Sequence, residues 1–355
     1  MSEMSALIAA TAARVMEAAD PAAMEFDAGA WSALAESGLL ETSVAEGLGG
    51  GGLPLSESAV TVRLAAYRCA FIPIAETVAA KWLLAKCGQT ATSTAPMTVA
   101  YGAPLTLEKT SGGHRATGRL EGVAWITGAG ETIAMGSRDG HNLLLRLNGP
   151  FQPDGERRNL AGEPRISITL DDIVVPGDCV WAFPDDGDLP LIYMAALRSV
   201  QLSGAMQRAL ETAIAYANDR VQFGRPIGRF QAVQQKLAEA AGNFAAGLAA
   251  SNEALVALDD PDPARRVISV AAAKSRCAAA ATHVAAVTHQ VMGAIGFTRE
   301  HDLHLATRRL WSWREEAGDE DYWNARLGRL VRDLGPARSW DLMGRVGEAA
   351  DTGGI

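Results

Sequence analysis

The stretch from Asp219 to Gln231 combines a fixed positive charge, an aromatic ring, a glycine and a proline in one short run. An arginine is always charged, and its planar guanidinium matches a pair of phosphate oxygens. Arg220 is therefore a candidate for binding a phosphorylated ligand, and Phe223 and Gln231 are candidates for contacting a flat heterocycle beside it. Because Pro226 lacks an N–H and disfavours helix at the preceding residue, the chain must leave a helix here.

A second run, from Gln290 to Glu300, contains two glycines three residues apart, Gly293 and Gly296. Glycine has no Cβ, so a ligand can approach its backbone closely. The alternative is that these glycines simply end a helix.

The residues around both runs recur at helical spacing. The face before the first run consists of Met206, Leu210, Ala213, Ile214, Ala217 and Val221, and the face after it of Val233, Leu237, Ala241, Phe244, Leu248 and Leu255. A further face consists of Val267, Val270, Lys274, Cys277, Ala281, Val284 and Val291. Segments of this length predict a helical bundle.

The first part of the chain is also helical in period, but short β-like runs separated by Gly, Asn and Pro follow from about Met97. These runs are Thr98–Tyr101, His114–Thr117, Val123–Thr127, Leu143–Leu147 and Ile166–Leu170. The sequence thus predicts an N-terminal helical domain at 1–96, a β domain at 97–185, a helical bundle at 186–350 and a tail at 351–355.

The composition restricts the class of protein. The 355 residues are 48% hydrophobic and 21% charged, which is typical of a globular chain. A net charge of −9 disfavours a nucleic-acid surface. The four cysteines form no Cys-x-x-Cys pair, no basic signal segment is visible and no apolar run reaches membrane-spanning length, so we expect a cytoplasmic protein without membrane insertion. His301 and His304 lack a nearby third ligand, so we expect no metal site.

Both runs are similar to segments of one family. Arg220-Val221-Gln222-Phe223-Gly224, followed by Gln231, resembles the flavin-contacting helix-turn-helix of the acyl-CoA dehydrogenase family, and Gln290–Glu300 resembles its other flavin-contacting segment. The resemblance covers nearly the whole chain. It implies a mostly α fold with a central β domain: an N-terminal helical domain, a small β-barrel or sandwich, and a C-terminal four-helix bundle.

The resemblance also implies FAD at a subunit interface, hence a dimer at least and a homo- or hetero-tetramer of acyl-CoA dehydrogenase subunits. One FAD would be contacted by Arg220, Phe223 and Gln231, and the other half-site would consist of Gln290, Gly293 and Ala294. Trp125 and Thr127, in a Trp-Ile-Thr strand like that of the family, would flank the isoalloxazine.

The family removes the α-proton of its substrate with a carboxylate while a hydride leaves the β-carbon for flavin N5. Counted from Gly296, the usual position of that carboxylate falls on Ala317, next to Glu316. The position used by some members, on the helix before the arginine motif, falls on Met194 beside Ala195. Either Glu316 is the base after a shift of one residue, or it belongs to a solvated helix end and the chain has no base.

The family's Glu-Pro-x-x-Gly-Ser-Asp loop is shortened here to Tyr101–Lys109, without the Gly-Ser pair. The expected function is FAD-dependent α,β-dehydrogenation of an acyl-CoA thioester in β-oxidation, with electrons passing to an electron-transfer flavoprotein. The alternative is a non-catalytic, base-lacking subunit of an α2β2 acyl-CoA dehydrogenase. Such a subunit would contribute an FAD half-site to an enzyme for bulky substrates such as steroid side-chain CoA esters.

Overall fold

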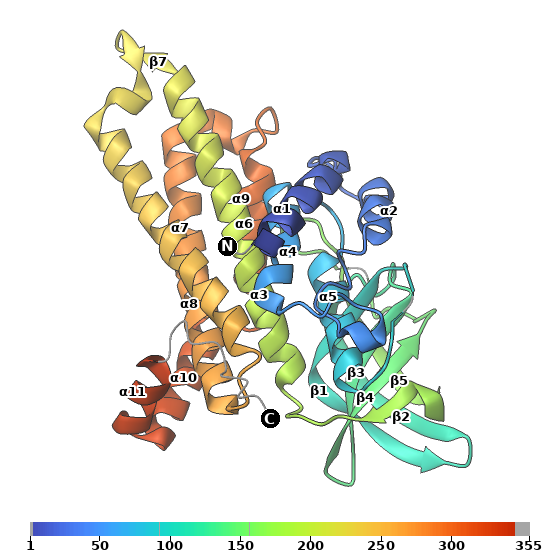
Figure 1. The fold of residues 1–355 in the computed structure, drawn as a ribbon. Coiled ribbons are helices and arrows are strands. Elements are labelled where there is room, and N and C mark those ends of the chain that lie inside the picture. Colours follow the sequence, from blue (N-terminus) through green and yellow to red (C-terminus); the bar gives the residue numbers. More distant parts are fainter. Residues whose placement is uncertain (1–2, 92, 156, 345–355) are drawn as a thin grey trace. The chain divides into compact units, whose positions relative to one another are not determined.

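A computed structural model describes residues 3–91, 93–155 and 157–344 (Figure 1). Helices come first, then strands, then long helices, so the predicted fold class is confirmed. The first helices are α1 (Glu3–Val15), α2 (Ala28–Glu36), α3 (Leu55–Ser58), α4 (Val60–Tyr67) and α5 (Ile74–Lys86). None of the described helices is both long and apolar enough to cross a membrane.

The chain forms two compact units. The first comprises described residues from 1–19, 23–58 and 71–194, and the second those from 20–22, 59–70 and 195–355. These units do not coincide with the helical and β segments of the chain. The predicted domain boundaries near residues 97 and 186 therefore stay a prediction. The predicted tail, 351–355, lies outside the described residues.

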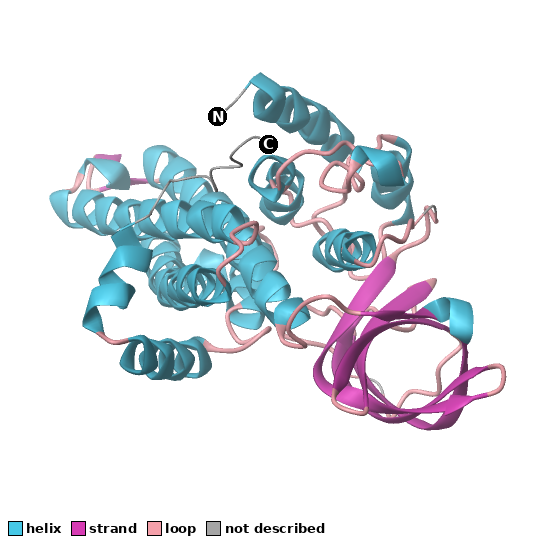
Figure 2. Ribbon diagram, turned by 60° about the horizontal axis from the view of Figure 1, so that its bottom comes forward, coloured by secondary structure: helices cyan, strands magenta, loops and turns pink. Residues whose placement is uncertain are grey.

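The first unit contains a strongly curved mixed sheet (Figure 2). Its strands are β1 (Met97–Thr110), β2 (Gly113–Ala124), β3 (Glu131–Arg138), β4 (His141–Asn148), β5 (Arg165–Pro176) and β6 (Val180–Ala182). They lie in the order β5-β2-β1-β3-β4-β6, with β1 and β3 parallel and the other pairs antiparallel. Alternate apolar side chains such as Leu105, Leu107, Leu143 and Leu145 form the core of this sheet.

Helix α5 packs against the sheet at strand β1. Its residues 74–84 are all buried. The Oγ1 of Thr77 donates to the carbonyl oxygen of Met97 and accepts from the N–H of Met97, both at 3.0 Å. This exchange fixes where β1 begins.

The predicted strand at Val123–Thr127 is wrong after Ala124. Trp125 has a φ of 60° and begins a turn, in which the N–H groups of Gly128 and Ala129 donate to its carbonyl oxygen at 2.9 Å. The β-branched residues and the tryptophan suggested a continuing strand, but the chain turns here to reach β3, which the sequence did not predict. The shortened segment Tyr101–Lys109 lies within β1, whose register against β3 shifts between Ala100 and Leu105.

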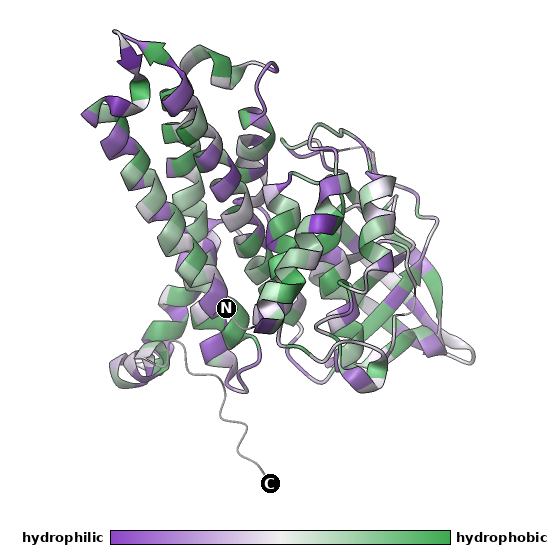
Figure 3. Ribbon diagram, turned by 45° about the horizontal axis from the view of Figure 1, so that its top comes forward, coloured by the Kyte–Doolittle hydropathy of each residue, from purple (hydrophilic) through white to green (hydrophobic). Residues whose placement is uncertain are grey.

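The second unit is a helical bundle in which hydrophobic and hydrophilic residues alternate along the helices (Figure 3). Its long elements are α6 (Leu189–Asp219), α7 (Gln231–Ala257) and α8 (Pro263–Met292), followed by α9 (Leu303–Trp313), α10 (Glu320–Leu334) and α11 (Pro336–Gly344). Asp262 caps α8 by accepting from the N–H of Ala264 at 2.9 Å, and Pro263 takes the first helical position, where no N–H is needed.

Helix α4 belongs to this bundle, because its backbone lies directly against α6. A Cβ at Gly204 would lie 2.2 Å from the carbonyl oxygen of Arg63, so only glycine allows the approach. The Nη1 of Arg63 donates to the Oε1 of Gln207 at 3.0 Å, which fixes the register of the two helices.

Candidate functional site

Helix α6 ends in a small β-hairpin rather than a simple turn between helices. Strand β7 (Val221–Gln222) pairs with β8 (Arg225–Pro226), and the two turn residues, Phe223 and Gly224, have φ values of 51° and 77°. Positive φ at both positions is the mark of the tight turn that joins two antiparallel strands. The predicted break in the helix is confirmed, and a hairpin fills it.

The backbone of Arg220 is fixed at the base of this hairpin. Its N–H donates to the carbonyl oxygen of Tyr216 at 2.9 Å, and its own carbonyl accepts from the N–H of Ile227 at 2.8 Å. The side chain of Arg220 is exposed. No carboxylate in the described parts of the chain forms an ion pair with it, so its guanidinium is available to a ligand.

The aromatic residue of the motif points away from the bundle. Phe223 is 92% exposed, although its ring is large and apolar. Its edge meets the ring of Phe230 at a centroid distance of 6.0 Å, and the guanidinium of Arg225 lies 4.2 Å from that second ring. Gln231, the first residue of α7, is also exposed. The hairpin thus offers a cation, an aromatic ring and an amide to a partner outside the bundle.

The second predicted segment follows α8 directly. Gly293 has a φ of 65°, and its N–H donates to the carbonyl oxygen of His289, so it ends the helix. A Cβ at Gly293 would meet no atom within 4 Å, which leaves room for a ligand as well. Gln290, Gly293 and Ala294 are all exposed. The ring of His289 stacks on Phe297 at 4.3 Å, an aromatic pair that the sequence did not indicate.

The two segments lie at the same end of the bundle (Figure 1). Tyr216, in the last turn of α6, packs its ring edge against His301, which follows the glycine segment, at 6.3 Å. Tyr216, Asp219, His301 and Asp302 line one shallow pocket there. The arginine hairpin and the glycine segment thus lie at the same end of one bundle, and their meeting across a subunit interface stays a prediction.

The predicted residues of the first unit are placed differently. Trp125 is 5% exposed and packs on Phe71 with a centroid distance of 4.9 Å. Its indole is therefore mainly a core side chain of that unit, whereas Thr127, two residues on, is exposed. A flavin contact by Trp125 and Thr127 stays a prediction.

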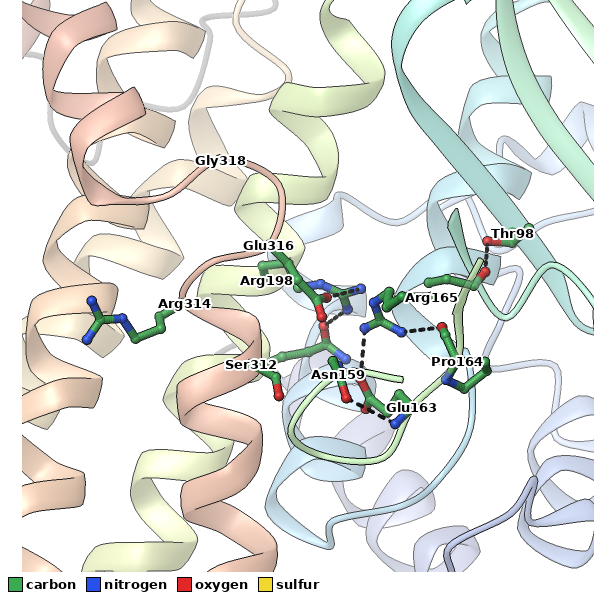
Figure 4. A network of polar contacts seen from close by, with 12 residues as sticks. Thr98, Asn159, Glu163, Pro164, Arg165, Arg198, Ser312, Arg314, Glu316 and Gly318 are labelled. Atoms are coloured by element: carbon green, nitrogen blue, oxygen red, sulfur yellow. Dashed lines mark hydrogen bonds and ion pairs between the residues drawn. The ribbon is translucent and has the colours of Figure 1, made fainter. Parts of the chain in front are cut away.

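The loop between α9 and α10 carries the candidate base. The Oε2 of Glu316 lies 3.0 Å from the Nη2 of Arg198, in an ion pair within the bundle (Figure 4). The side chain of Arg198 is 1% exposed and that of Glu316 13%. The Nη1 of Arg198 also donates to the Oε1 of Gln201. Glu316 is thus an engaged, half-buried carboxylate rather than a solvated one.

The neighbouring carboxylate, Glu315, is 57% exposed, and its Oε1 lies 2.7 Å from the Nε of Arg314. Ala317 is buried and has a φ of 55°, and Gly318 follows with a φ of 86°. Met194 and Ala195, at the alternative position on α6, are fully buried. Arg198 was not predicted, although an arginine inside an otherwise apolar helical segment was a signal that could have found it.

Two family models match the chain: acyl-CoA dehydrogenase, N-terminal domain, over residues 2–94, and acyl-CoA dehydrogenase, C-terminal domain, over residues 191–329. Acyl-CoA dehydrogenase FadE34 of Mycobacterium tuberculosis is 36% identical over 138 residues, which cover 39% of this chain and 19% of that protein. IpdE2 of the same organism is 38% identical over 128 residues, 36% of this chain and 37% of IpdE2. The chain therefore matches well under half the length of these two relatives. FadE27 is 24% identical over 323 residues, 80% of this chain and 83% of FadE27.

Solved structures share the fold over nearly the whole chain. The ChsE4–ChsE5 complex from M. tuberculosis has a TM-score of 0.86 at 22% identity, covering 95% of this chain and 99% of the matched chain. The Tcur3481–Tcur3483 steroid acyl-CoA dehydrogenase variant has a TM-score of 0.83 at 21% identity, covering 93% and 98%. PigA with FAD and proline has a TM-score of 0.81 at 17% identity, covering 94% and 99%.

Proposed function

The chain belongs to the acyl-CoA dehydrogenase family, and we propose that it is a subunit of an FAD-dependent enzyme that desaturates an acyl-CoA thioester between its α and β carbons. The observation that carries the proposal is the exposed hairpin after α6. There the fixed charge of Arg220 and the ring of Phe223, which is 92% exposed, lie on one short hairpin, and together they suit a nucleotide ligand.

The residues present fit FAD. Arg220 would bind the diphosphate, Phe223 would cover an apolar part of the cofactor and Gln231 would donate hydrogen bonds to it. When bound, FAD supplies the acceptor for the substrate's β-hydride. The proposed acceptor of the electrons is an electron-transfer flavoprotein, and one of the structural neighbours is described as such a protein.

We infer that two subunits share each FAD. Gln290, Gly293 and Ala294 are exposed, and their segment lies at the same end of the bundle as the hairpin. The partner is a second acyl-CoA dehydrogenase chain, identical or different. Two structural neighbours, the ChsE4–ChsE5 complex and the Tcur3481–Tcur3483 enzyme, each pair two differently named chains, which supports a heteromeric assembly.

The ion pair at Glu316 favours a partner as the source of the catalytic base. A carboxylate that takes the α-proton must be a good proton acceptor, and the positive charge of Arg198, 3.0 Å from the Oε2 of Glu316, makes that carboxylate a weaker one. Residue 317, the family's usual position, is an alanine. In this version the chain contributes a flavin half-site and the interface, and the substrate is a bulky ester such as a steroid side-chain CoA.

One observation favours the other candidate, in which Glu316 is the base. Its side chain is only 13% exposed, and a carboxylate withdrawn from water is what a general base of this kind requires. In that case Arg198 would orient the carboxylate, and substrate binding would have to replace the ion pair.

One experiment distinguishes the two candidate sources of the catalytic base, Glu316 and the partner subunit. The chain is purified alone and with a second acyl-CoA dehydrogenase polypeptide, and dye reduction is measured with a panel of acyl-CoA esters for wild type and Glu316→Gln. Turnover by the chain alone that Glu316→Gln abolishes supports Glu316 as the base. A colourless, inactive chain that gains FAD only with the second polypeptide, with turnover unaffected by Glu316→Gln, supports the partner subunit. Failure to retain FAD under both conditions overturns the proposed function.

A further inference from the structure

Lys274, near the middle of α8, is a charged side chain without solvent exposure. It is 0% exposed, in a helix whose neighbouring turns bury Val270, Ala271, Cys277 and Ala278. In the sequence it is one position of an apolar face. A lysine is rarely fully buried unless its ammonium group has specific partners.

Its partners are the two ends of the loop between α9 and α10. The Nζ of Lys274 donates to the carbonyl oxygen of Arg314 at 2.7 Å and to that of Gly318 at 2.8 Å. These carbonyls lie just after α9 and just before α10, where no helical N–H is available to them. One ammonium group thus bridges the loop from end to end.

The loop is held in a second place. The Nε1 of Trp323 donates to the carbonyl oxygen of Ala317 at 2.8 Å. Ala317 has a φ of 55°, a left-handed conformation that costs an alanine about 1 kcal/mol or more. A Cβ at Gly318 would lie 2.7 Å from that same Nε1, so only glycine fits there. Such a conformation persists only where the surroundings impose it.

In the sequence, Glu316 lies between Arg314 and Gly318, the two residues whose carbonyl oxygens Lys274 binds. We propose that Lys274 is a positioning residue that acts through Glu316: by fixing both ends of the loop, it sets where the Glu316 carboxylate meets Arg198. It does not touch substrate or cofactor in this account.

The energetics point away from a purely stabilising role. Burial lowers the pKa of Lys274 from 10.5 to about 8, and the nearby Glu316 carboxylate opposes part of that shift. Burying the ammonium therefore costs folding free energy at neutral pH, which apolar packing would not. A buried charge that lowers the folding free energy gain in this way is typical of residues that serve a function.

The role given to Lys274 rests on the proposed function, because the position of Glu316 matters only if its loop serves the reaction. The tests read backbone exchange and a lysine titration, so they succeed or fail independently of flavin binding and turnover. The first compares amide hydrogen exchange in Lys274→Met and Lys81→Met. Lys81 is the control, since it is also buried and donates to two carbonyls, of Ala91 and Ser93, in the first unit, where it pairs with Glu41 at 2.7 Å as well.

We expect exchange across residues 314–318 to accelerate about tenfold or more in Lys274→Met, because each lost hydrogen bond from a charged donor is worth about that factor. Lys81→Met leaves this loop as in wild type. Equal protection of the loop in Lys274→Met and wild type overturns the proposal.

A second measurement needs no change at Lys274. The chain is labelled with ¹³C-lysine, and the Lys274 signal is titrated in wild type and in Glu316→Gln. Removal of the carboxylate should move the Lys274 titration to lower pH. A Lys274 titration that Glu316→Gln does not move contradicts the coupling on which the proposal depends.

Discussion

Arg198 on α6 and Glu316 on the loop before α10 form an ion pair of 3.0 Å, and the arginine side chain is 1% exposed. The pair joins two parts of the bundle that lie far apart in the sequence. It also occupies one oxygen of the loop carboxylate, Oε2, with a buried guanidinium.

Arg198→Met should destabilise the chain by about 3–5 kcal/mol, because it leaves a half-buried carboxylate without its charge partner. The free energy of unfolding is measured by urea denaturation. Arg208→Met is the control: Arg208 and Asp302 are 3.9 Å apart, with side chains 31% and 57% exposed, so its loss should cost at most about 1 kcal/mol. Equal costs for the two variants would contradict a structural role for the Arg198 pair.

The free energy of unfolding should rise with pH above about 8 because of Lys274. Its pKa is about 8 in the folded chain and 10.5 ordinarily, so between these values the unfolded chain binds a proton that the folded chain has lost. The cost of burying the ammonium is thus present below pH 8 and disappears as pH rises toward 10.5. The slope from this group is at most about 1.4 kcal/mol per pH unit.

Cys277 works in the opposite direction at higher pH. Burial raises the pKa of its thiol from 9.0 to about 12, so it lowers stability as pH rises above 9. Because Lys274 and Cys277 also shift each other's pKa, wild type and Lys274→Met are compared at pH 8 to 9, below the range in which the thiol titrates. Parallel pH curves for wild type and Lys274→Met would refute the assignment.

Gly204→Ala should destabilise the bundle by about 1–3 kcal/mol, because the new methyl group would lie 2.2 Å from the carbonyl oxygen of Arg63 and force α4 away from α6. Gly242→Ala is the matched control within α7. A Cβ there meets no atom within 4 Å, so the change should stabilise by about 0.5–1 kcal/mol. Thermal melts of the two variants check the opposite signs; a melting temperature that Gly204→Ala raises would contradict the close approach.

The sequence was most informative where local chemistry decides the structure. Pro226 required a helix break, and the break is there, because a missing N–H acts whatever the tertiary context. The two-residue strands of the hairpin were beyond prediction, since nothing in so short a run distinguishes a strand from a turn. At Trp125 the residue types favour a strand, but the chain turns there before it continues into β3.

In the candidate active loop, by contrast, contacts between residues distant in the sequence decide the structure. Glu316 and Ala317 were located by counting from Gly296, but their surroundings depend on contacts distant in sequence. Lys274 is 40 residues from Arg314 and 44 from Gly318, so its position on a helical face gave no sign of the carbonyls it binds. Arg198 was likewise unpredictable as the partner of Glu316. Helical periodicity identifies which residues face inward, but not what they meet.

The most direct test of the proposed function is FAD binding by the assembled protein in wild type, Arg220→Gln and Arg229→Gln, measured by flavin absorbance and by titration with FAD. Arg229 is a matched control, an exposed arginine nine residues further along the same connection. We predict that Arg220→Gln weakens FAD binding by about tenfold to a hundredfold, the worth of a charge-assisted hydrogen bond to phosphate, with Arg229→Gln close to wild type. Undiminished FAD affinity in Arg220→Gln would contradict the account.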